Sequence, residues 1–340
     1  MAHFIFRNVN DAFTQLVTMF HKGHMVVEDG TDPSGKYKNW KPVPAPIRES
    51  PSRNGKVLYF DEPVTVTLTH PRERVLFNQA RDCNPFFHLY EALWMLAGRC
   101  DAESLVYYNS GMSRYANKSK YFDGAYGERW RGWMFDGIAD DGGYEQYAGC
   151  QLIKLIKHLK VNPNSRRAVL QMWNPVEDLV NIETTKDACC NLCVCFSIRD
   201  GSLEATVFNR SHDLVWGMLG ANAVHFSFLQ EWVARQLQVK VGPLHFCTNN
   251  LHVYVGEEDG VSKWKPDEWL KDNSEGVYDE EPNEGLQVST YSLGTSLEKI
   301  EEFVDDIWDY RGDSFFLNHV ARPMLHAFYR HKERDYKKAL

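Results

Sequence analysis

The sequence predicts one domain of the α/β or α+β class, because strand patterns and helix patterns alternate along the chain. Pro63–His70 alternates apolar residues with threonine, which is typical of a half-buried strand. Phe86–Ala97 is dense in apolar residues, which is typical of a buried helix, and Gly98 is expected to end it. The 340 residues are 43% hydrophobic and 25% charged, an ordinary globular composition. This length allows one large domain or two medium ones, and the alternation of elements favours one domain over residues 1–340.

A loop and a hairpin are predicted on either side of the middle of the chain. Residues 30–56 are rich in Gly, Pro, Ser and Lys and predict a long loop. Cys193–Arg199 and Ser202–Asn209 predict a hairpin, because the Asp200-Gly201 pair between them is a two-residue turn signal.

Helical periodicity predicts a further helix over Ala223–Leu237. Its residues Val224, Phe228 and Trp232 recur at every fourth position and form one apolar face. The other predicted segments are strands over Ala168–Trp173 and Leu244–Tyr254, an acidic surface insertion over 257–287, the start of a helix over Ser296–Val304 and a charged tail from Arg330.

Charge and cysteine content exclude some classes of protein. The formal net charge of −8 argues against a surface that coats nucleic acid, although local arginines can still bind a small anion. Eight cysteines in a chain of 340 residues do not suggest a disulfide scaffold. Met1–Asn10 lacks the profile of a secretory signal, and no apolar run approaches the ~20 residues of a membrane helix. We therefore expect a cytoplasmic protein with reduced thiols and with neither nucleic acid nor membrane as a partner.

Four cysteines, at positions 189, 190, 193 and 195, lie close together. They allow a metal site, a nucleophile, or a strand that carries small buried thiols. If the segment is extended, Cys189, Cys193 and Cys195 share one face and Cys190 points to the other. Same-face neighbours on a strand are ~6.6 Å apart, which is too far for one zinc ion to collect three of them comfortably. No Cys or His pair with finger-like spacing follows, so the pattern favours no metal ion.

The residues downstream favour a nucleophile at Cys190. The segment Arg210–Asp213 places a cation, a hydroxyl and a carboxylate at the end of the second hairpin strand, and Gly217 and Asn222 follow. A solvated loop would explain this segment alone. A hairpin can, however, bring Cys190 and Arg210 together, and a nearby guanidinium favours the thiolate over the thiol.

This arrangement of Cys190, Arg210-Ser211-x-Asp213, Gly217 and Asn222 resembles the signature of thymidylate synthases. Further matches occur in chain order at Glu91-Ala92-Leu93-Trp94, Tyr126-Gly127, Trp130-Arg131, Ser165-Arg166-Arg167 and His252-Val253-Tyr254. The resemblance covers roughly residues 50 to 255, and Gly220–His225 is similar to phage-type synthases and hydroxymethylases. It implies a large twisted mixed sheet flanked by helices, with 5,10-methylenetetrahydrofolate as the one-carbon donor to a deoxypyrimidine monophosphate. If a phage encodes the chain, the host cytoplasm is the expected location.

The resemblance implies catalytic roles for three side chains. Uracil is a poor electrophile until a nucleophile adds at C6, and Cys190 would be that nucleophile. Glu91, in an apolar helix, would relay protons to the pyrimidine O4, because burial lets a carboxyl group donate and accept protons near neutral pH. A helix-surface position is the alternative for Glu91. Tyr126 would assist removal of the C5 proton.

The same resemblance implies a clamp for the nucleotide phosphate. Arg210, Arg166 and Arg167 would bind it through their guanidinium forks, with Ser211 also in the substrate-binding set. In this superfamily the arginine pair reaches into the neighbouring subunit, which implies an obligate homodimer with shared active sites. Arg53 is a further candidate ligand, with Arg48 as its neighbour.

Other matched residues would hold the sugar, the base and the folate. His252 and Tyr254 would bind the 3′-hydroxyl. Asn222 would read uracil N3–H and O4, because its amide supplies both an acceptor and a donor. Asp213 would hydrogen-bond the pterin ring, and Gly217 would leave room for it; Asp213 and Asn222 also join the catalytic set.

Three departures from the synthase pattern bear on the product. Asn191 follows the nucleophile where a synthase has His, and Met112 and Tyr115 align with an aromatic stretch that supplies a Trp against the folate. The tail over 335–340 has no evident likeness to the apolar synthase C-terminus. A sealed site favours hydride transfer and a methyl product, whereas a wetter site favours water and a hydroxymethyl product. The departures favour dUMP hydroxymethylation, with thymidylate synthesis as the alternative.

The base and the rival functions remain open. Hydroxymethylases that act on dCMP tend to carry Asp where uracil enzymes carry Asn, so Asn222 favours dUMP over dCMP. To align Asn222 with the Asn of uracil enzymes, this chain must carry one inserted residue between Gly217 and Asn222. Without that insertion, Ala221 would align with the Asn. The other rivals are a catalytically inactive homologue that binds nucleotide or RNA, and a zinc module built on the cysteines.

Overall fold

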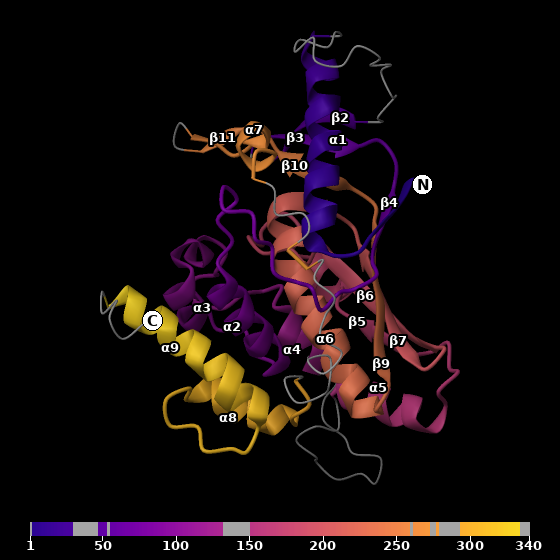
Figure 1. Cartoon of the computed structure of the whole chain (residues 1–340), viewed down its shortest axis with the longest axis vertical. Helices are drawn as coiled ribbons and strands as arrows, with labels where there is room; N and C mark the ends of the chain where they lie inside the picture. The colour runs from indigo at the N-terminus through magenta and orange to yellow at the C-terminus, as the bar shows by residue number, and fades with distance from the viewer. Residues whose placement is uncertain are drawn as a thin grey trace. The chain divides into compact units, whose positions relative to one another are not determined.

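The computed structural model describes residues 2–29, 47–52, 55–131, 150–258, 261–272, 277–278 and 293–333 (Figure 1). By internal contacts the chain divides into two compact units. Unit 1 comprises residues 1–83, 206–223 and 243–280, and unit 2 comprises residues 84–205, 224–242 and 281–340. Among the described residues, no helix is both long and apolar enough to cross a membrane.

Two mixed sheets confirm the predicted mixed α/β class. The strands of the larger sheet are neighbours in the order β1 (Ala2–Phe6), β4 (Val64–Leu68), β9 (Lys240–Thr248), β7 (Ser202–Asn209), β6 (Asn191–Arg199) and β5 (Val169–Gln171). β1 runs parallel to β4, whereas β4–β9 and β5–β6 are antiparallel. The smaller sheet has the order β2 (Ile47–Ser52), β3 (Gly55–Phe60), β10 (Leu251–Tyr254) and β8 (His212–Asp213), with β8 parallel to β10. β11 (Glu257–Glu258) and β12 (Val261–Ser262) form a separate pair.

In unit 1, the long helix α1 (Val9–Asp29) packs against β1, β2 and the short helix α7 (Pro266–Trp269), as Figure 1 shows. Asn8 begins the helix by accepting hydrogen bonds from the N–H groups of Asn10 and Asp11. Phe13 and Phe20 are buried, and their rings pack at steep angles against those of Trp269 and Trp264, with centroid separations of 5.8 and 6.4 Å. Both tryptophans belong to the predicted surface insertion, so part of that segment contributes to the core of this unit.

In unit 2, helix α2 (Pro85–Leu96) is the central element. Asn84 caps it by accepting a hydrogen bond from the N–H of Phe87, and every residue from Phe87 to Leu96 is buried. The helices packed against α2 are α3 (Ala102–Tyr108), α4 (Tyr126–Arg131), α8 (Leu297–Asp305) and α9 (Arg322–Lys332). Gly127 allows α4 to approach, because a Cβ there would lie 2.3 Å from the carbonyl oxygen of Met95. The remaining helical segments of the unit are η1 (Ser110–Arg114), α5 (Gln151–Val161), η2 (Pro175–Leu179) and η6 (Leu317–Ala321), with most of α6 (Asn222–Leu237).

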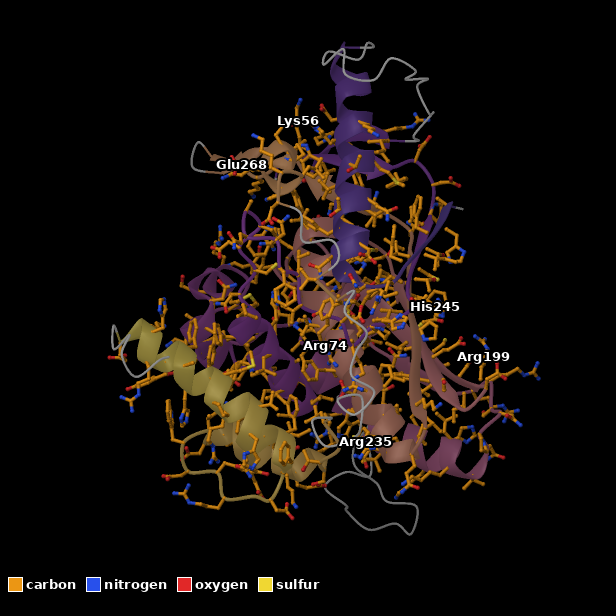
Figure 2. The ribbon with its side chains drawn as sticks, in the orientation of Figure 1. Lys56, Arg74, Arg199, Arg235, His245 and Glu268 are labelled. Atoms are coloured by element: carbon orange, nitrogen blue, oxygen red, sulfur yellow. The ribbon has the colours of Figure 1, made fainter. Side chains whose placement is uncertain are left out.

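Most of the predicted elements are confirmed. β4, α2, β5 and α6 fall within or beside their predicted ranges, and Ser296 caps α8. The β6–β7 hairpin turns at Asp200 and Gly201, whose φ values of 48° and 74° are those of a type I′ turn. The Arg199 side chain, labelled in Figure 2, pairs with Glu204 beside this turn.

Two predicted boundaries are wrong. Of the predicted loop over 30–56, residues 47–52 and 55–56 form a β2–β3 hairpin, because Ile47, Val57 and Leu58 are buried and β3 also pairs with β10. The predicted strand Leu244–Tyr254 is two strands in different sheets. They separate at Asn249 and Asn250, whose backbones bond to Asn209 and His212 instead of continuing one ladder.

Candidate active site

Cys190 directly precedes β6, in unit 2, and its side chain is half-buried. Its backbone N–H donates to the hydroxyl of Tyr126 on α4 at 3.3 Å, and its thiol donates to the carbonyl of Ala188 at 3.6 Å. Burial raises the pKa of Tyr126 well above its ordinary value, and a negative charge on Cys190 raises it further. Tyr126 is therefore a neutral phenol beside an accessible thiol.

Cys189 lies in a different environment from Cys190. It is buried, and its thiol donates to the carbonyl of Asn191 at 2.9 Å. Burial raises the pKa of Cys189 strongly, which disfavours its thiolate. β6 begins only at Asn191, so the prediction from strand faces does not apply to these two cysteines. Burial distinguishes them instead, because Cys189 is buried and Cys190 is half-buried.

The other two cysteines lie on β6. Cys193 and Cys195 alternate with buried Val194, so they share the less buried face, as predicted. Burial raises the pKa of Cys193 to about 11. In the described part of the chain, no three His, Cys, Asp or Glu side chains are grouped to hold a metal ion.

A buried ion pair anchors α4 within unit 2. Arg129 donates to both carboxylate oxygens of Asp178 at 2.6 and 2.8 Å, and to the carbonyl oxygens of Met172 and Asp123. Removing one partner would leave the other charge buried and uncompensated. This pair therefore fixes the helix that presents Tyr126.

Glu91 is buried on α2, and its Oε2 lies 2.7 Å from Nε2 of His225, a buried residue of α6. The two atoms are close, but their alignment falls short of a hydrogen bond, which is common at catalytic sites without substrate. Both amide atoms of buried Asn191, next to Cys190, also have no hydrogen-bond partner among the described residues. Buried polar groups are normally satisfied, so this polarity indicates a site that water or a ligand completes.

Asp187, three residues before Cys190, was not singled out from the sequence. Burial raises the pKa of its carboxyl group to about 6, opposed by a hydrogen bond from the N–H of Gly124 at 3.1 Å. The charges of Asp123 and Glu91 raise it further, which links Asp187 electrostatically to the predicted proton relay. No sequence motif around Asp187 predicts the burial of its carboxyl group.

Unit 1 holds the second group of predicted residues. Arg210 and Ser211 lead into β8, and His252 on β10 lies with its Nδ1 3.5 Å from Ser211 Oγ. The ring of Tyr254 meets that of His252 edge-on at 5.2 Å. Asp213 begins the π-helical segment η3 (Leu214–Ala221) by accepting hydrogen bonds from the next turn, and burial raises its pKa.

Asn222 lies at the end of η3, where its Nδ2 is 2.9 Å from Nε2 of His212. The other ring nitrogen of His212 is 3.4 Å from the hydroxyl of Thr248. Gly217 adjoins the same ring, and a Cβ at this glycine would lie 3.0 Å from it. The predicted role of Gly217 was space for folate; the structure shows that the glycine also leaves space for His212. His212 occupies the variable position x of the Arg210-Ser211-x-Asp213 motif, and its burial was not predicted.

The arginine pair occupies a different part of unit 2. Arg166 and Arg167 are exposed on the loop between α5 and β5, beside a surface hollow of about 540 Å³. Ser165 organises the loop by accepting from the N–H of Arg167 and bonding His158 at 2.6 Å.

Met112 is half-buried on η1. The residues that lie outside the described part of the chain include Arg53, the charged tail from residue 334, and residues 259–260, 273–276 and 279–287 of the acidic insertion.

A family model described as thymidylate synthase matches residues 77–308, more than half of the chain. The chain belongs to the thymidylate synthase family. Two phage proteins named deoxyuridylate hydroxymethyltransferase are similar to it. That of Pseudomonas phage M6 is 47% identical over 216 residues, which cover 63% of this chain and 56% of the relative. That of Bacillus phage SP01 is 38% identical over 203 residues, which cover 60% of this chain and 52% of the relative.

The thymidylate synthase of Ascaris suum is more distant, at 27% identity over 186 residues, which cover 51% of this chain and 62% of the relative. The chain thus spans only about half the length of the phage relatives that it matches. The predicted resemblance to this family and its phage-type members is confirmed.

Proposed function

We propose that this chain is a one-carbon transferase that acts at C5 of dUMP and forms 5-hydroxymethyl-dUMP. The observation that carries the proposal is half-buried Cys190, whose backbone N–H donates to the hydroxyl of half-buried Tyr126, with a buried Glu91 in the same unit. Support also comes from the likeness to two phage proteins named for deoxyuridylate hydroxymethylation. Metal chemistry has no part in the proposal.

The chemistry proposed for unit 2 begins at sulfur. Cys190 Sγ would add to C6 of uracil, which makes C5 nucleophilic. The C5 hydrogen leaves as a proton, and Tyr126 would assist as a hydrogen-bonding phenol, because burial keeps its proton in place. Glu91 would hold a proton next to the pyrimidine O4. C5 exchanges its proton for a CH₂ unit, and one water molecule adds its hydroxyl group to that unit. The bond between Cys190 Sγ and C6 then breaks, which restores the thiolate and releases the product. The C5 proton and the second proton of the water account for the two hydrogens that tetrahydrofolate gains when it loses the CH₂ unit.

The residues proposed for recognition lie in both units. Arg210, Ser211, Arg166, Arg167 and Arg53 would bind the phosphate. In unit 1, His252 and Tyr254 would hold the sugar hydroxyl and Asn222 would read the base. The contact of Ser211 with His252 supports one continuous binding surface for sugar and phosphate.

Methylenetetrahydrofolate would supply the one-carbon unit, as family membership implies. The residues of unit 1 fit such a group, because the carboxyl group of Asp213 is fixed at the start of η3 and the indole of Trp216 beside it is 59% exposed. A pterin ring offers N–H donors to a carboxylate and a flat face to an indole. Gly217 leaves the approach open, and Met112 of unit 2 is the proposed contact in place of an aromatic residue.

The product test is the reaction with methylenetetrahydrofolate and dUMP, followed by mass analysis and by absorbance. The expected result is 5-hydroxymethyl-dUMP with regenerated tetrahydrofolate. The second candidate is thymidylate synthase, favoured by the family match, and it predicts dTMP with stoichiometric dihydrofolate. Release of tritium from C5 of labelled dUMP distinguishes both from an inactive homologue, which would release none.

A homodimer with shared sites is part of the proposal. Exposed apolar side chains on β5 and η2 support an interface in this region: Val169, Val176, Leu179 and Val180 are 45% to 74% exposed. Arg167→Ala and Cys190→Ala homodimers should each be nearly inactive. Reassembled mixtures should regain activity, because one site of each heterodimer then carries both intact residues. Verified heterodimers without activity would rule out a clamp from the neighbouring subunit.

A further inference from the structure

His212 is a buried residue of unit 1 that the proposed chemistry does not use. It is only 2% exposed, and its ring packs edge-on against Phe246 at 5.4 Å. Each ring nitrogen faces one polar group: Nε2 faces Asn222 Nδ2 at 2.9 Å, and Nδ1 faces Thr248 Oγ1 at 3.4 Å. A glycine at position 217 leaves space for the ring. The ring is therefore held on three sides and directed at one amide.

This contact couples the direction of the Asn222 amide to the tautomer of His212. Burial lowers the pKa of His212 to about 3, and a charge on His252 lowers it further, so the imidazole is neutral at physiological pH. A neutral ring has one donor and one acceptor. Because the Nδ2 group of Asn222 can only donate, Nε2 accepts from it, the ring proton lies on Nδ1, and the Thr248 hydroxyl accepts that proton. An inverted amide would require the other tautomer of His212 and a Thr248 hydroxyl that donates to Nδ1.

The direction of this amide distinguishes the two pyrimidines. Uracil offers a donor at N3 and an acceptor at O4, whereas cytosine offers an acceptor at N3 and a donor at its amino group. An amide held with its oxygen free and one N–H free suits uracil. An amide free to invert could pair with either base, because inversion exchanges its donor and its acceptor.

We infer that His212, held by Thr248, fixes the Asn222 amide in the orientation that selects uracil over cytosine. His212 is thus a positioning residue for base specificity. The inference rests on the proposed function, in which Asn222 reads the base. This role would explain why a histidine lies between Ser211 and Asp213 and why a glycine, Gly217, lies beside its ring.

The test compares dUMP with dCMP as substrates of the wild type, His212→Ala and Thr248→Val. The measured quantity is the ratio of the two kcat/KM values, which a purely structural role would not change. His212→Ala should lower the preference for dUMP by about 10- to 100-fold, the usual effect of one lost polar discrimination. Thr248→Val keeps the shape of the side chain and should lower the preference less, because only the partner of Nδ1 is removed.

The matched control is His245→Ala. His245, which is labelled in Figure 2, lies on the same strand as Thr248 and bonds Thr67. Because side chains alternate along a strand, His245 points to the face opposite that of Phe246. Its preference for dUMP should stay at the wild-type value. If His212→Ala is folded and keeps the wild-type preference, or loses both activities equally, the inference is overturned. If His212→Ala does not fold, Thr248→Val decides by the same criterion.

A failure of the proposed function can be told apart from a failure of this inference. If the wild type turns over neither nucleotide, the proposed activity is wrong. The ratio of the dissociation constants of dUMP and dCMP, measured by calorimetry, then replaces the kinetic ratio. A ratio that falls in His212→Ala supports the positioning role, and an unchanged ratio overturns it.

Discussion

The candidate site residues of the two units differ in how their hydrogen bonds are satisfied. In unit 2, Glu91, His225 and Asn191 carry buried polar atoms that have no hydrogen-bond partner among the described residues. In unit 1, His212 bonds both Asn222 and Thr248. A group that must exchange protons or water with substrate cannot be fully engaged beforehand, whereas a group that recognises a fixed pattern gains from being held. We therefore distinguish a reacting set of residues in unit 2 from a recognising set of residues in unit 1.

The largest effect is expected at the sulfur of unit 2. Cys190→Ala should lower C5 tritium release from dUMP by at least about 10,000-fold, because the proposed bond between Sγ and C6 can then no longer form. Binding of dUMP, measured by calorimetry, should change by less than about threefold. The matched control is Cys189→Ala, whose buried thiol donates to the backbone carbonyl of Asn191 and which should retain most of the activity. An inactive Cys189→Ala beside an active Cys190→Ala would reverse the assignment.

A smaller loss is expected at the carboxyl–imidazole contact. Glu91→Gln should lower kcat by about 1,000-fold with little change in dUMP affinity, because an amide cannot exchange the proton. His225→Gln keeps a polar group beside Glu91 and should lower kcat by about 10-fold. If Glu91→Gln weakens dUMP binding as strongly as it lowers kcat, Glu91 belongs to the recognising set and the comparison between the units fails. The ratio of kcat to KM effects in the two variants distinguishes these outcomes.

Local sequence signals were sufficient for elements whose partners are near in the chain. Asp200-Gly201 predicted the hairpin because a type I′ turn needs positive φ at both positions. The apolar run Phe86–Ala97, with Gly98 after it, predicted α2. A similar signal existed for α1, since Val9, Phe13, Leu16 and Phe20 recur with helical period, but it was not used.

The motif order predicts candidate site residues, but not the contacts that hold them. His225 was visible only as one letter of a phage-like segment, and its contact with Glu91 joins residues 134 positions apart in the chain (225 − 91). His212 owes its role to Thr248 on another strand. Such pairings depend on tertiary packing, which no local pattern encodes. The break of the predicted 244–254 strand has the same origin, because the two halves pair in different sheets.

The smallest effect concerns Asp187 and is a change in stability. Its carboxyl pKa is raised from 3.8 to about 6, so the folded state holds a proton that the unfolded state releases. The stability that this group contributes is complete below about pH 4 and is lost as pH rises to about 6. Asp187→Asn keeps an acceptor for the N–H of Gly124 but does not titrate. It should be more stable than the wild type above pH 6, by up to about 3 kcal/mol, and equally stable near pH 4.

Urea unfolding between pH 4 and pH 8 measures this difference, with Glu183→Gln as the control because that side chain is exposed on the same segment. A pH-independent effect of Asp187→Asn would mean that the carboxyl group is ionised throughout. The measurement also sharpens the comparison between the units. The charge of Glu91 is one cause of the raised pKa of Asp187, so Glu91→Gln should move the end of the stability loss below pH 6. If the loss ends at the same pH in Glu91→Gln, Glu91 does not contribute to the raised pKa of Asp187, and the two carboxyl groups act independently.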